Sequence, residues 1–421
     1  MSKPFLLFQG PVATRSGYGD HSRDLLASLF KMDKFDIKVI PTRWGNTPQN
    51  QINPQTELGQ QILKNVVTKI DKQPDVYVQV TVANEFRPVG KYNIGITAGV
   101  ETTVAPKSFV DGCNRMDLIL VPSRFTKQTL EQTSWDETHK QTGQLIKQHK
   151  ITKPIEVLPE GVELELYQTP PKIENFLEGL ETDFNYLVVG HWLQGELGED
   201  RKDIGMTIQT FCTVFKDLPK KQQPGLILKT SSAGFSVIDR EAITKKIKGI
   251  TKELGDKCPP IYLLFGDLKP EEMANLYHHP KVKSMVSFTK GEGYGRPLCE
   301  FTLTGKPIIV SKWSGHTDFL PEKYTVYIDG QLKNVHESAA NDFLLKESKW
   351  FSVNYSDAAK KMYDVYNNYK AHEMKSKNLK INTRKFFSLG RMDEMFLDIM
   401  NKLNIKVPEK VELKLPEIKK L

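Results

Sequence analysis

Short apolar runs alternate with longer amphipathic stretches along most of the chain. In the first 165 residues, the apolar runs predict strands at 4–8, 35–40, 75–80, 92–97, 117–121 and 154–158. Between some of these runs, apolar residues recur at helical spacing, which predicts helices at 20–30, 57–70 and 123–131. Strands that alternate with helices of this length are typical of βαβ units and of a parallel sheet covered on both faces.

The alternation breaks at 167–181, where two prolines, several acids and little periodicity indicate a linker. It then restarts, with strands predicted at 185–189, 225–229, 260–265, 283–288 and 306–310. The second set of predicted helices lies at 206–215, 240–254, 270–278, 297–303, 356–369 and 392–403. The tail from Val407 mixes Lys, Glu and Pro, and we expect it to be loosely ordered.

A chain of 421 residues is too long for one ordinary hydrophobic core, which agrees with two lobes. We therefore predict an α/β protein in four parts: an N-terminal lobe over 1–165, a linker over 166–184, a second doubly wound lobe over 185–350, and C-terminal helices with the tail over 351–421. Ligands of such sheets bind outside the carboxyl ends of the strands, so the loops that lead into helices are where chemistry is expected.

The composition, with 39% hydrophobic and 26% charged residues, is that of a soluble globular protein. No apolar run approaches the ~20 residues that span a bilayer, and the first residues lack the pattern of a signal peptide. The four cysteines lie far apart without CxxC spacing, which disfavours a zinc site and predicts reduced thiols in the cytoplasm. Of the net charge of +8, little lies in the first 165 residues, where 20 Lys and Arg oppose 18 Asp and Glu. We interpret the excess as a solvated basic surface rather than a dedicated face for a polyanion.

The most informative segment for chemistry is 287–300, which reads SFTKGEGYGRPLCE, follows an apolar strand and opens a helical pattern. Glycines at every second position from Gly291 permit tight turns and the close approach of a ligand, and Pro297 suits the first turn of a helix. Free N–H groups at the start of a helix attract anions. Glu292 in the loop and Glu300 in the helix can accept hydrogen bonds from sugar or ribose hydroxyls.

The stretch EGYGRPLCE, from Glu292 to Glu300, resembles the E-x7-E signature of retaining GT-B glycosyltransferases, especially the family-4 type. Further segments resemble that family in the same order along the chain: LPEGVE at 158–163, FGDL at 265–268, MANLY at 273–277, GKPIIVS at 305–311 and SGHTDFL at 314–320. The resemblance implies two Rossmann-like lobes that face each other across a cleft, with C-terminal helices packing back. By the same resemblance Glu300 would hold the donor ribose, Glu292 the hydroxyls of the transferred sugar, and the backbone of Gly293, Tyr294 and Gly295 the diphosphate.

A leaving diphosphate gains negative charge, which the protein has to stabilise inside a closed cleft. In the family, an Arg and then a Lys follow the first strand of the second lobe, and Arg201 and Lys202 match them. The V-G-R of many relatives reads Val-Gly-His191 here, so either His191 shares this role or Arg201 fulfils it alone. Lys229, at the end of a predicted strand, is a further candidate, and Leu268 is a candidate for the neighbourhood of the nucleotide base.

Two loops of the first lobe also resemble the family. Gly17 and Gly19 lie in RSGYGD at 15–20, which is similar to the glycine-containing loop that approaches the donor phosphates and the acceptor. Glu101 lies in GITAGVETTVAP at 95–106, which is similar to a loop with a W-E-x-x-x-x-P pattern, although Val100 replaces the aromatic residue. The resemblance places Glu101 near the acceptor or the anomeric centre.

The resemblance thus implies an enzyme that transfers a sugar from a nucleoside-diphosphate sugar of the UDP or GDP type to a hydroxyl acceptor, with retention. No metal is expected, because Arg and Lys neutralise the diphosphate and no clear DxD motif precedes a suitable loop. Family base rates favour a glycan or lipid-linked glycan as acceptor, with peripheral membrane contact as an option. The alternatives are a viral-type enzyme that glycosylates hydroxymethylated bases in DNA, a non-catalytic nucleotide-sugar-binding protein, and a two-lobed sugar epimerase that needs no acceptor.

Overall fold

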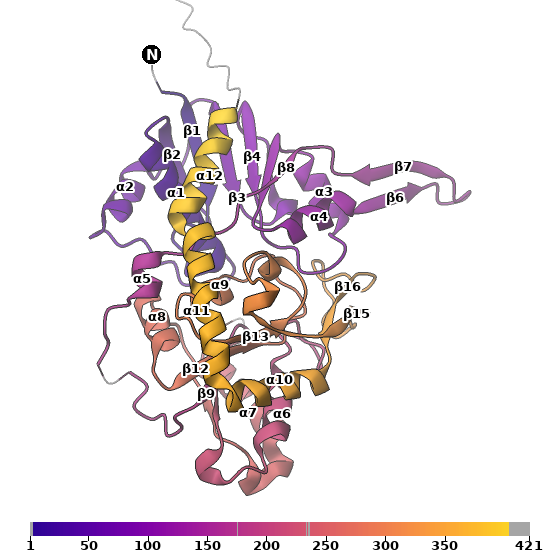
Figure 1. Ribbon diagram of the computed structural model, residues 1–421. Helices are drawn as coiled ribbons and strands as arrows, with labels where there is room; N and C mark the ends of the chain where they lie inside the picture. The colour runs from indigo at the N-terminus through magenta and orange to yellow at the C-terminus, as the bar shows by residue number, and fades with distance from the viewer. Residues whose placement is uncertain (1–2, 175, 233, 235, 404–421) are drawn as a thin grey trace, which may run out of the picture.

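The computed structural model describes residues 3–174, 176–232, 234 and 236–403, so the tail predicted from Val407 lies outside the described residues. Two parallel sheets of six strands each form two lobes, one above the other in Figure 1, and helices flank each sheet. This arrangement confirms the prediction of two doubly wound sheets.

The N-terminal sheet has the strand order β2-β1-β3-β4-β5-β8. Its strands are β1 (Phe5–Gly10), β2 (Asp36–Pro41), β3 (Val76–Val80), β4 (Tyr92–Ile96), β5 (Leu118–Val121) and β8 (Ile155–Val157). The helices of this lobe are α1 (Gly17–Met32), α2 (Glu57–Asn65), α3 (Lys107–Cys113) and α4 (Arg124–Gln132). The helix predicted at 57–70 ends at Asn65, because Val66, a β-branched residue, forms a bridge with Val39 of β2 instead.

The C-terminal sheet has the order β11-β10-β9-β12-β13-β14. Its strands are β9 (Asn185–Val189), β10 (Gly225–Lys229), β11 (Ile261–Leu263), β12 (Val282–Ser287), β13 (Ile308–Ser311) and β14 (Val326–Ile328). The helices around it are α6 (Ile204–Phe215), α7 (Val237–Thr251), α8 (Pro270–His278) and α9 (Arg296–Thr302). The edge strand β14 was not predicted, since three residues are too few to give a clear apolar run.

Three helices close the described chain: α10 (Tyr355–Asn367), α11 (Tyr369–Phe386) and α12 (Leu389–Lys402). α10 packs on the C-terminal lobe, whereas α11 and α12 lead back to the N-terminal lobe, in yellow in Figure 1. Met392, Phe396 and Ile399 of α12 are buried in the core of the N-terminal sheet, and Asp393 accepts a hydrogen bond from Ser28 of α1. The C-terminal helices therefore pack back onto the first lobe, as predicted.

Smaller elements decorate both lobes. A hairpin of β6 (Ser134–Thr138) and β7 (Leu145–Lys150) projects from the N-terminal lobe (Figure 1), and β15 (Gly330–Asn334) pairs with β16 (Lys349–Val353) in the other lobe. The short helix α5 (Leu164–Gln168) begins the connection between the lobes. Short 3₁₀ turns lie at Ala83–Glu85, Lys220–Gln222, Lys252–Lys257, Gly315–Asp318 and Glu322–Tyr324. Among the described residues, no helix combines the length and the apolar character that crossing a membrane requires.

Candidate active site

Loops from the carboxyl ends of strands in both sheets meet between the lobes. The loop after β4 lies directly against the glycine loop that follows β12. A Cβ built on Gly293 would lie 1.9 Å from the carbonyl oxygen of Ala98, and one built on Gly291 would lie 1.9 Å from that of Glu101. Ser123, the N-cap of α4, donates a hydrogen bond of 2.6 Å to the carbonyl oxygen of Gly293. The glycines therefore allow backbone of the two lobes to come into contact.

Four residues that the resemblance assigns to the transferred sugar, the leaving diphosphate or the acceptor come together where these loops meet. We call these residues, Glu101, Arg201, Lys202 and Glu292, the charged cluster. The ammonium of Lys202 is ion-paired with Glu292. Arg201 lies 3.3 Å from the carboxylate of Glu292 and 3.1 Å from that of Glu101. Thr289 donates a further hydrogen bond of 2.7 Å to Glu292. Two cations and two carboxylates from both lobes thus share one small volume.

The charged cluster is largely withdrawn from solvent, and Glu292 is only 7% exposed. Burial alone would raise the pKa of Glu292, but the charges of Lys202 and Arg201 lower it to about 2. The pKa of Glu101 is raised, because burial outweighs the charge of Arg201. Glu292 is therefore ionised, and an anion entering the cluster would compete with its carboxylate for the same two cations.

Glu300, the second glutamate of the signature, lies on α9 in a different polar cluster. Its carboxylate accepts hydrogen bonds from Arg296 at 3.1 Å and from the hydroxyl of Tyr277 at 3.2 Å. Arg296 also lies 2.9 Å from Asp24 of α1 and 3.7 Å from Glu160, so it ties the two lobes together. Burial raises the pKa of Glu300 to about 7. Within the described ranges, no hydrogen bond or ion pair joins Glu300 to the charged cluster.

The backbone of 293–295, which the resemblance places at the diphosphate, is buried between the two glutamates, and the carbonyl oxygens of Gly293 and Gly295 already accept hydrogen bonds within the protein. The side chain of Tyr294 points into the protein, where its hydroxyl donates a hydrogen bond of 2.6 Å to the carbonyl oxygen of Glu160. Gly295, the N-cap of α9, has a φ of +97°, a conformation that favours glycine. The turn from loop to helix therefore depends on this glycine.

The glycine loop of the first lobe reaches the second lobe through a neighbouring arginine. Gly17 and Gly19 lie in the first turn of α1, where a Cβ on Gly19 would clash with the carbonyl oxygen of Thr14 in its own loop. No heavy atom lies within 4 Å of a Cβ built on Gly17. Arg15, in contrast, is ion-paired across the lobes with Asp267 at 2.7 Å.

The remaining predicted residues lie on the C-terminal lobe. Lys229 donates a hydrogen bond of 2.7 Å to the carbonyl oxygen of Gly266, and burial lowers the pKa of its ammonium. Leu268 packs, partly buried, against the core of this lobe. Nδ1 of His191 lies 3.0 Å from the hydroxyl of Ser231, and burial lowers the pKa of the imidazole. The nearby cations Lys202, Lys229 and Arg201 lower this pKa further.

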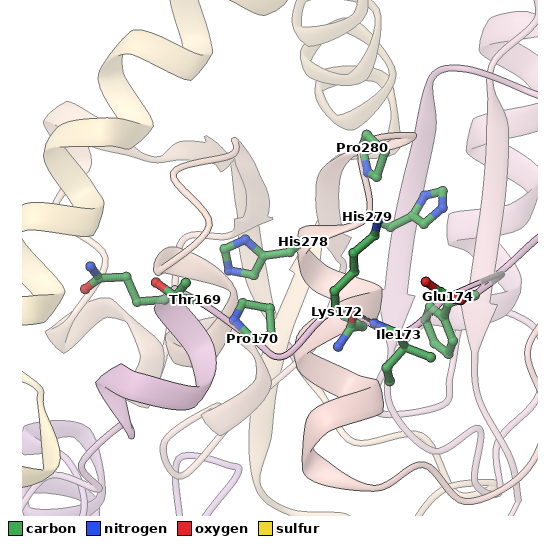
Figure 2. Close-up of a pocket in the computed structure, with 11 residues that line it drawn as sticks. Thr169, Pro170, Lys172, Ile173, Glu174, His278, His279 and Pro280 are labelled. Atoms are coloured by element: carbon green, nitrogen blue, oxygen red, sulfur yellow. Dashed lines mark hydrogen bonds between the residues drawn. The ribbon is translucent and has the colours of Figure 1, made fainter.

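A separate pocket of about 780 Å³ lies between the linker and the end of α8 (Figure 2). His278 in its wall is 2.7 Å from the carbonyl oxygen of Tyr167. The adjacent His279 and Pro280 precede β12, so this pocket lies at the opposite end of that strand from the glycine loop. In the described part of the chain, no group of three or more His, Cys, Asp or Glu is placed to hold a metal ion.

The sequence matches no family model and no curated protein, but solved structures match it over almost its whole length. A glycosyltransferase from Rickettsia africae ESF-5 matches with a TM-score of 0.61 and 14% identity, over 97% of this chain and 100% of its own. Sucrose-phosphate synthase from Thermosynechococcus elongatus matches with a TM-score of 0.62 and 14% identity, over 95% and 99%. Anabaena HepE, in complex with UDP and glucose, matches with a TM-score of 0.60 and 12% identity, over 95% and 100%. The chain has the GT-B fold.

Sequence reasoning missed three residues with contacts at the candidate site: Arg296, Thr289 and Ser123. Ser123 opens a predicted helix, and its N-cap preference is a signal that could have marked it. Arg296 lies inside the signature itself, but its partners on α1 become neighbours only when the lobes meet.

Proposed function

We propose that the protein is a retaining glycosyltransferase that moves a sugar from a nucleoside-diphosphate sugar to a hydroxyl-bearing acceptor. The charged cluster carries this proposal, because Lys202 and Arg201 converge on Glu292 beside a glycine loop where the lobes meet. Such a site offers positive charge to a leaving diphosphate and carboxylate oxygens to hydroxyls. Its GT-B neighbours support the proposal, since they include a glycosyltransferase, a sucrose-phosphate synthase and a protein in complex with UDP and glucose.

In the proposed reaction, Arg201 and Lys202 stabilise the charge that develops on the diphosphate as the bond from its oxygen to the anomeric carbon breaks. Glu292 accepts hydrogen bonds from the transferred sugar, and Glu101 faces the acceptor or the anomeric centre. The departing phosphate oxygen takes the proton of the acceptor hydroxyl, whose oxygen bonds to the same face of the sugar. The configuration is therefore retained, and positioning replaces a protein base. Because two side chains supply the charge, we propose that no metal is required.

The donor nucleotide is proposed to lie along the C-terminal lobe, with Glu300 at the ribose and the backbone of 293–295 at the diphosphate. Lys229 and Leu268 are proposed to lie on the nucleotide side of the site, and Gly17 and Gly19 to approach the donor phosphates and the acceptor. UDP is the nucleotide to test before GDP, since HepE was solved with UDP-glucose. In this proposal, residues 1–165 form the acceptor lobe and 185–350 the donor lobe of a cytoplasmic protein.

The charge around the site bears on the choice of acceptor, and the carboxyl groups near Arg296 are buried. Besides burial, the charges of Asp24 and Asp20 raise the pKa of Glu160, to about 7, although Arg296 opposes them. Burial and Asp24 also raise the pKa of Glu163. Buried carboxyl groups with raised pKa values are partly neutral, and the first 165 residues carry only 20 Lys and Arg against 18 Asp and Glu, too small an excess to attract a polyanion. We therefore propose a glycan or the glycan part of a lipid-linked acceptor over DNA. Binding of duplex DNA that weakens steeply with salt would favour the DNA alternative instead.

Nucleotide binding tests the donor site. Calorimetric titration with UDP, GDP, ADP and CDP would compare the wild type with Glu300→Ala and with Glu322→Ala, which removes an exposed carboxylate paired with Lys312. A ligand at ~100 times its Kd adds about 2.7 kcal/mol to the free energy of unfolding, so thermal melting can check the same result. We expect one nucleotide to bind, and to bind more weakly to Glu300→Ala alone. Unchanged affinity in Glu300→Ala would contradict the ribose site, and a wild type that binds none of the four would contradict the proposed function.

A further inference from the structure

A fully buried ion pair lies directly behind the charged cluster. Nζ of Lys290 is 3.3 Å from a carboxylate oxygen of Asp203, and the two side chains are 1% and 0% exposed. The hydroxyl of Tyr355, at the start of α10, donates a hydrogen bond of 2.8 Å to the same oxygen. The hydroxyl of Ser352 in β16 is 3.4 Å from the ammonium of Lys290. None of these four residues contacts the donor in the proposed function.

The pair joins the two chain segments that carry the charged cluster. Asp203 directly follows Lys202, and Lys290 directly precedes the glycine loop with Glu292. The backbone N–H of Lys290 donates a hydrogen bond of 2.7 Å to the carbonyl oxygen of Arg201. The turn that carries Arg201 and Lys202 is thus fixed against the loop that carries Glu292 by one backbone hydrogen bond and one buried ion pair.

Folding alone does not require charges at these two positions. Asp203 has a left-handed backbone with φ 52° and ψ 41°, which costs a residue with a side chain on the order of 1 kcal/mol or more and costs glycine little. A buried ion pair is often no more stabilising than apolar residues of similar volume, because both charges lose their water. Removing both charges together, with glycine at 203 and an apolar residue at 290, therefore avoids a lone buried charge and leaves a small cavity and the unpaired hydroxyl of Tyr355 as its cost.

We propose that Asp203 and Lys290 are positioning residues, which hold the Arg201–Lys202 turn in register with the glycine loop so that both cations converge on one diphosphate. This inference rests on the proposed function, because it needs the diphosphate to bind at the charged cluster. Tyr355 and Ser352 extend the arrangement to the C-terminal segment, so that β16 and α10 brace the site from behind.

Calorimetric titration with UDP, beside thermal melting, tests the inference. The double variant Asp203→Gly/Lys290→Met removes both charges together and accepts the left-handed backbone, so we expect it to fold. Its affinity for UDP should fall about tenfold or more, because a misplaced turn weakens the charge-assisted hydrogen bonds from Arg201 and Lys202 to the diphosphate. Asp203→Asn tolerates the backbone conformation and still accepts the hydrogen bond from Tyr355, but it leaves the ammonium of Lys290 buried without a counter-charge. It should therefore lower the melting temperature more than the double variant does.

Val365→Ala is the control for lost stability, because it truncates a buried residue of α10 in the same core without touching the ion pair. It should lower the melting temperature and leave the affinity for UDP within about twofold of wild type. The inference is overturned if the double variant binds UDP as tightly as wild type, or if Val365→Ala loses affinity to the same extent. If the wild type binds GDP rather than UDP, the affinities of the same variants are compared with GDP as the ligand. A wild type that binds none of UDP, GDP, ADP and CDP overturns the proposed function first, before any variant is made.

Discussion

Gly293 is the position where an added methyl group is expected to separate the lobes. In Gly293→Ala, the new Cβ would lie 1.9 Å from the carbonyl oxygen of Ala98 and 2.9 Å from the carbon of the same carbonyl. Real Cβ atoms essentially never approach other atoms closer than 3.0 Å. Both atoms belong to the backbone, so no flexible side chain can move aside. To remove this clash, the loop after β4, the glycine loop, or both must shift by about 1 Å.

This shift would occur where the loop after β4 meets the glycine loop, and the proposed function places the acceptor and the donor at these two loops. Since ~1 Å of misplacement can cost about 100-fold in rate, we expect kcat for release of the nucleoside diphosphate to fall by about two orders of magnitude. Overpacking typically lowers the free energy of unfolding by about 1–3 kcal/mol, which urea denaturation would measure. Affinity for the free nucleotide should change less, because Arg201, Lys202 and Glu292 all lie on the C-terminal lobe.

Gly249→Ala is the matched control, because Gly249 lies within α7 and no heavy atom lies within 4 Å of its added Cβ. It should keep the wild-type kcat and raise the free energy of unfolding by roughly 0.5–1 kcal/mol. A Gly293→Ala protein with the kcat and stability of wild type would refute the backbone contact between the lobes.

Three further predictions concern the buried charges. The pKa of Glu292 is lowered to about 2 by Lys202 and Arg201 against the effect of burial, so its stabilisation is present above its ordinary pKa of 4.5 and is lost as the pH falls towards 2. Denaturation across that range should show this loss in the wild type and not in Glu292→Gln, and equal slopes in both would contradict the ion pair. Burial raises the pKa of Glu300 to about 7, so its contribution to stability falls as the pH rises from 4.5 to about 7, and Glu300→Gln should flatten that decline. An identical decline in the variant would show that Glu300 is not buried as described. Arg296→Met leaves Asp24 and Glu160 buried without their cation and should lower the free energy of unfolding by about 3–5 kcal/mol, whereas Arg391→Met, at an exposed pair with Glu394, should change it by less than about 1 kcal/mol; similar losses in both would contradict the interlobe link.

The strands of both sheets were predictable because buried parallel strands are continuous apolar runs, and eleven of the twelve sheet strands lie on predicted runs. α11 escaped prediction for a physical reason: only Ser376, Leu379 and Thr383 are buried along it, so no apolar stripe marks the helix. The tertiary surroundings of Val66 likewise ended α2 earlier than its periodicity indicated.

The candidate site was predictable only where its residues belong to recognisable motifs. Residues 201 and 292 are far apart in the chain, and the resemblance to known glycosyltransferases, rather than any local pattern, paired them. The links made by Arg296 and the pair of Lys290 with Asp203 could not be predicted, because each depends on segments that meet only in the folded protein. An isolated charge in a sequence looks the same whether it lies in solvent or in an ion pair.

Turnover of a sugar nucleotide in the absence of an added acceptor tests the proposed activity most directly, with water taking the place of the acceptor hydroxyl. The protein would be incubated with α-linked UDP and GDP sugars, and proton NMR would follow the free sugar as it appears. We predict slow release of one nucleoside diphosphate with the α-anomer as the first sugar product, and loss of this release in Lys202→Met. The β-anomer as first product would contradict retention, and no release from any sugar nucleotide by a protein that binds the nucleotide would contradict catalysis itself.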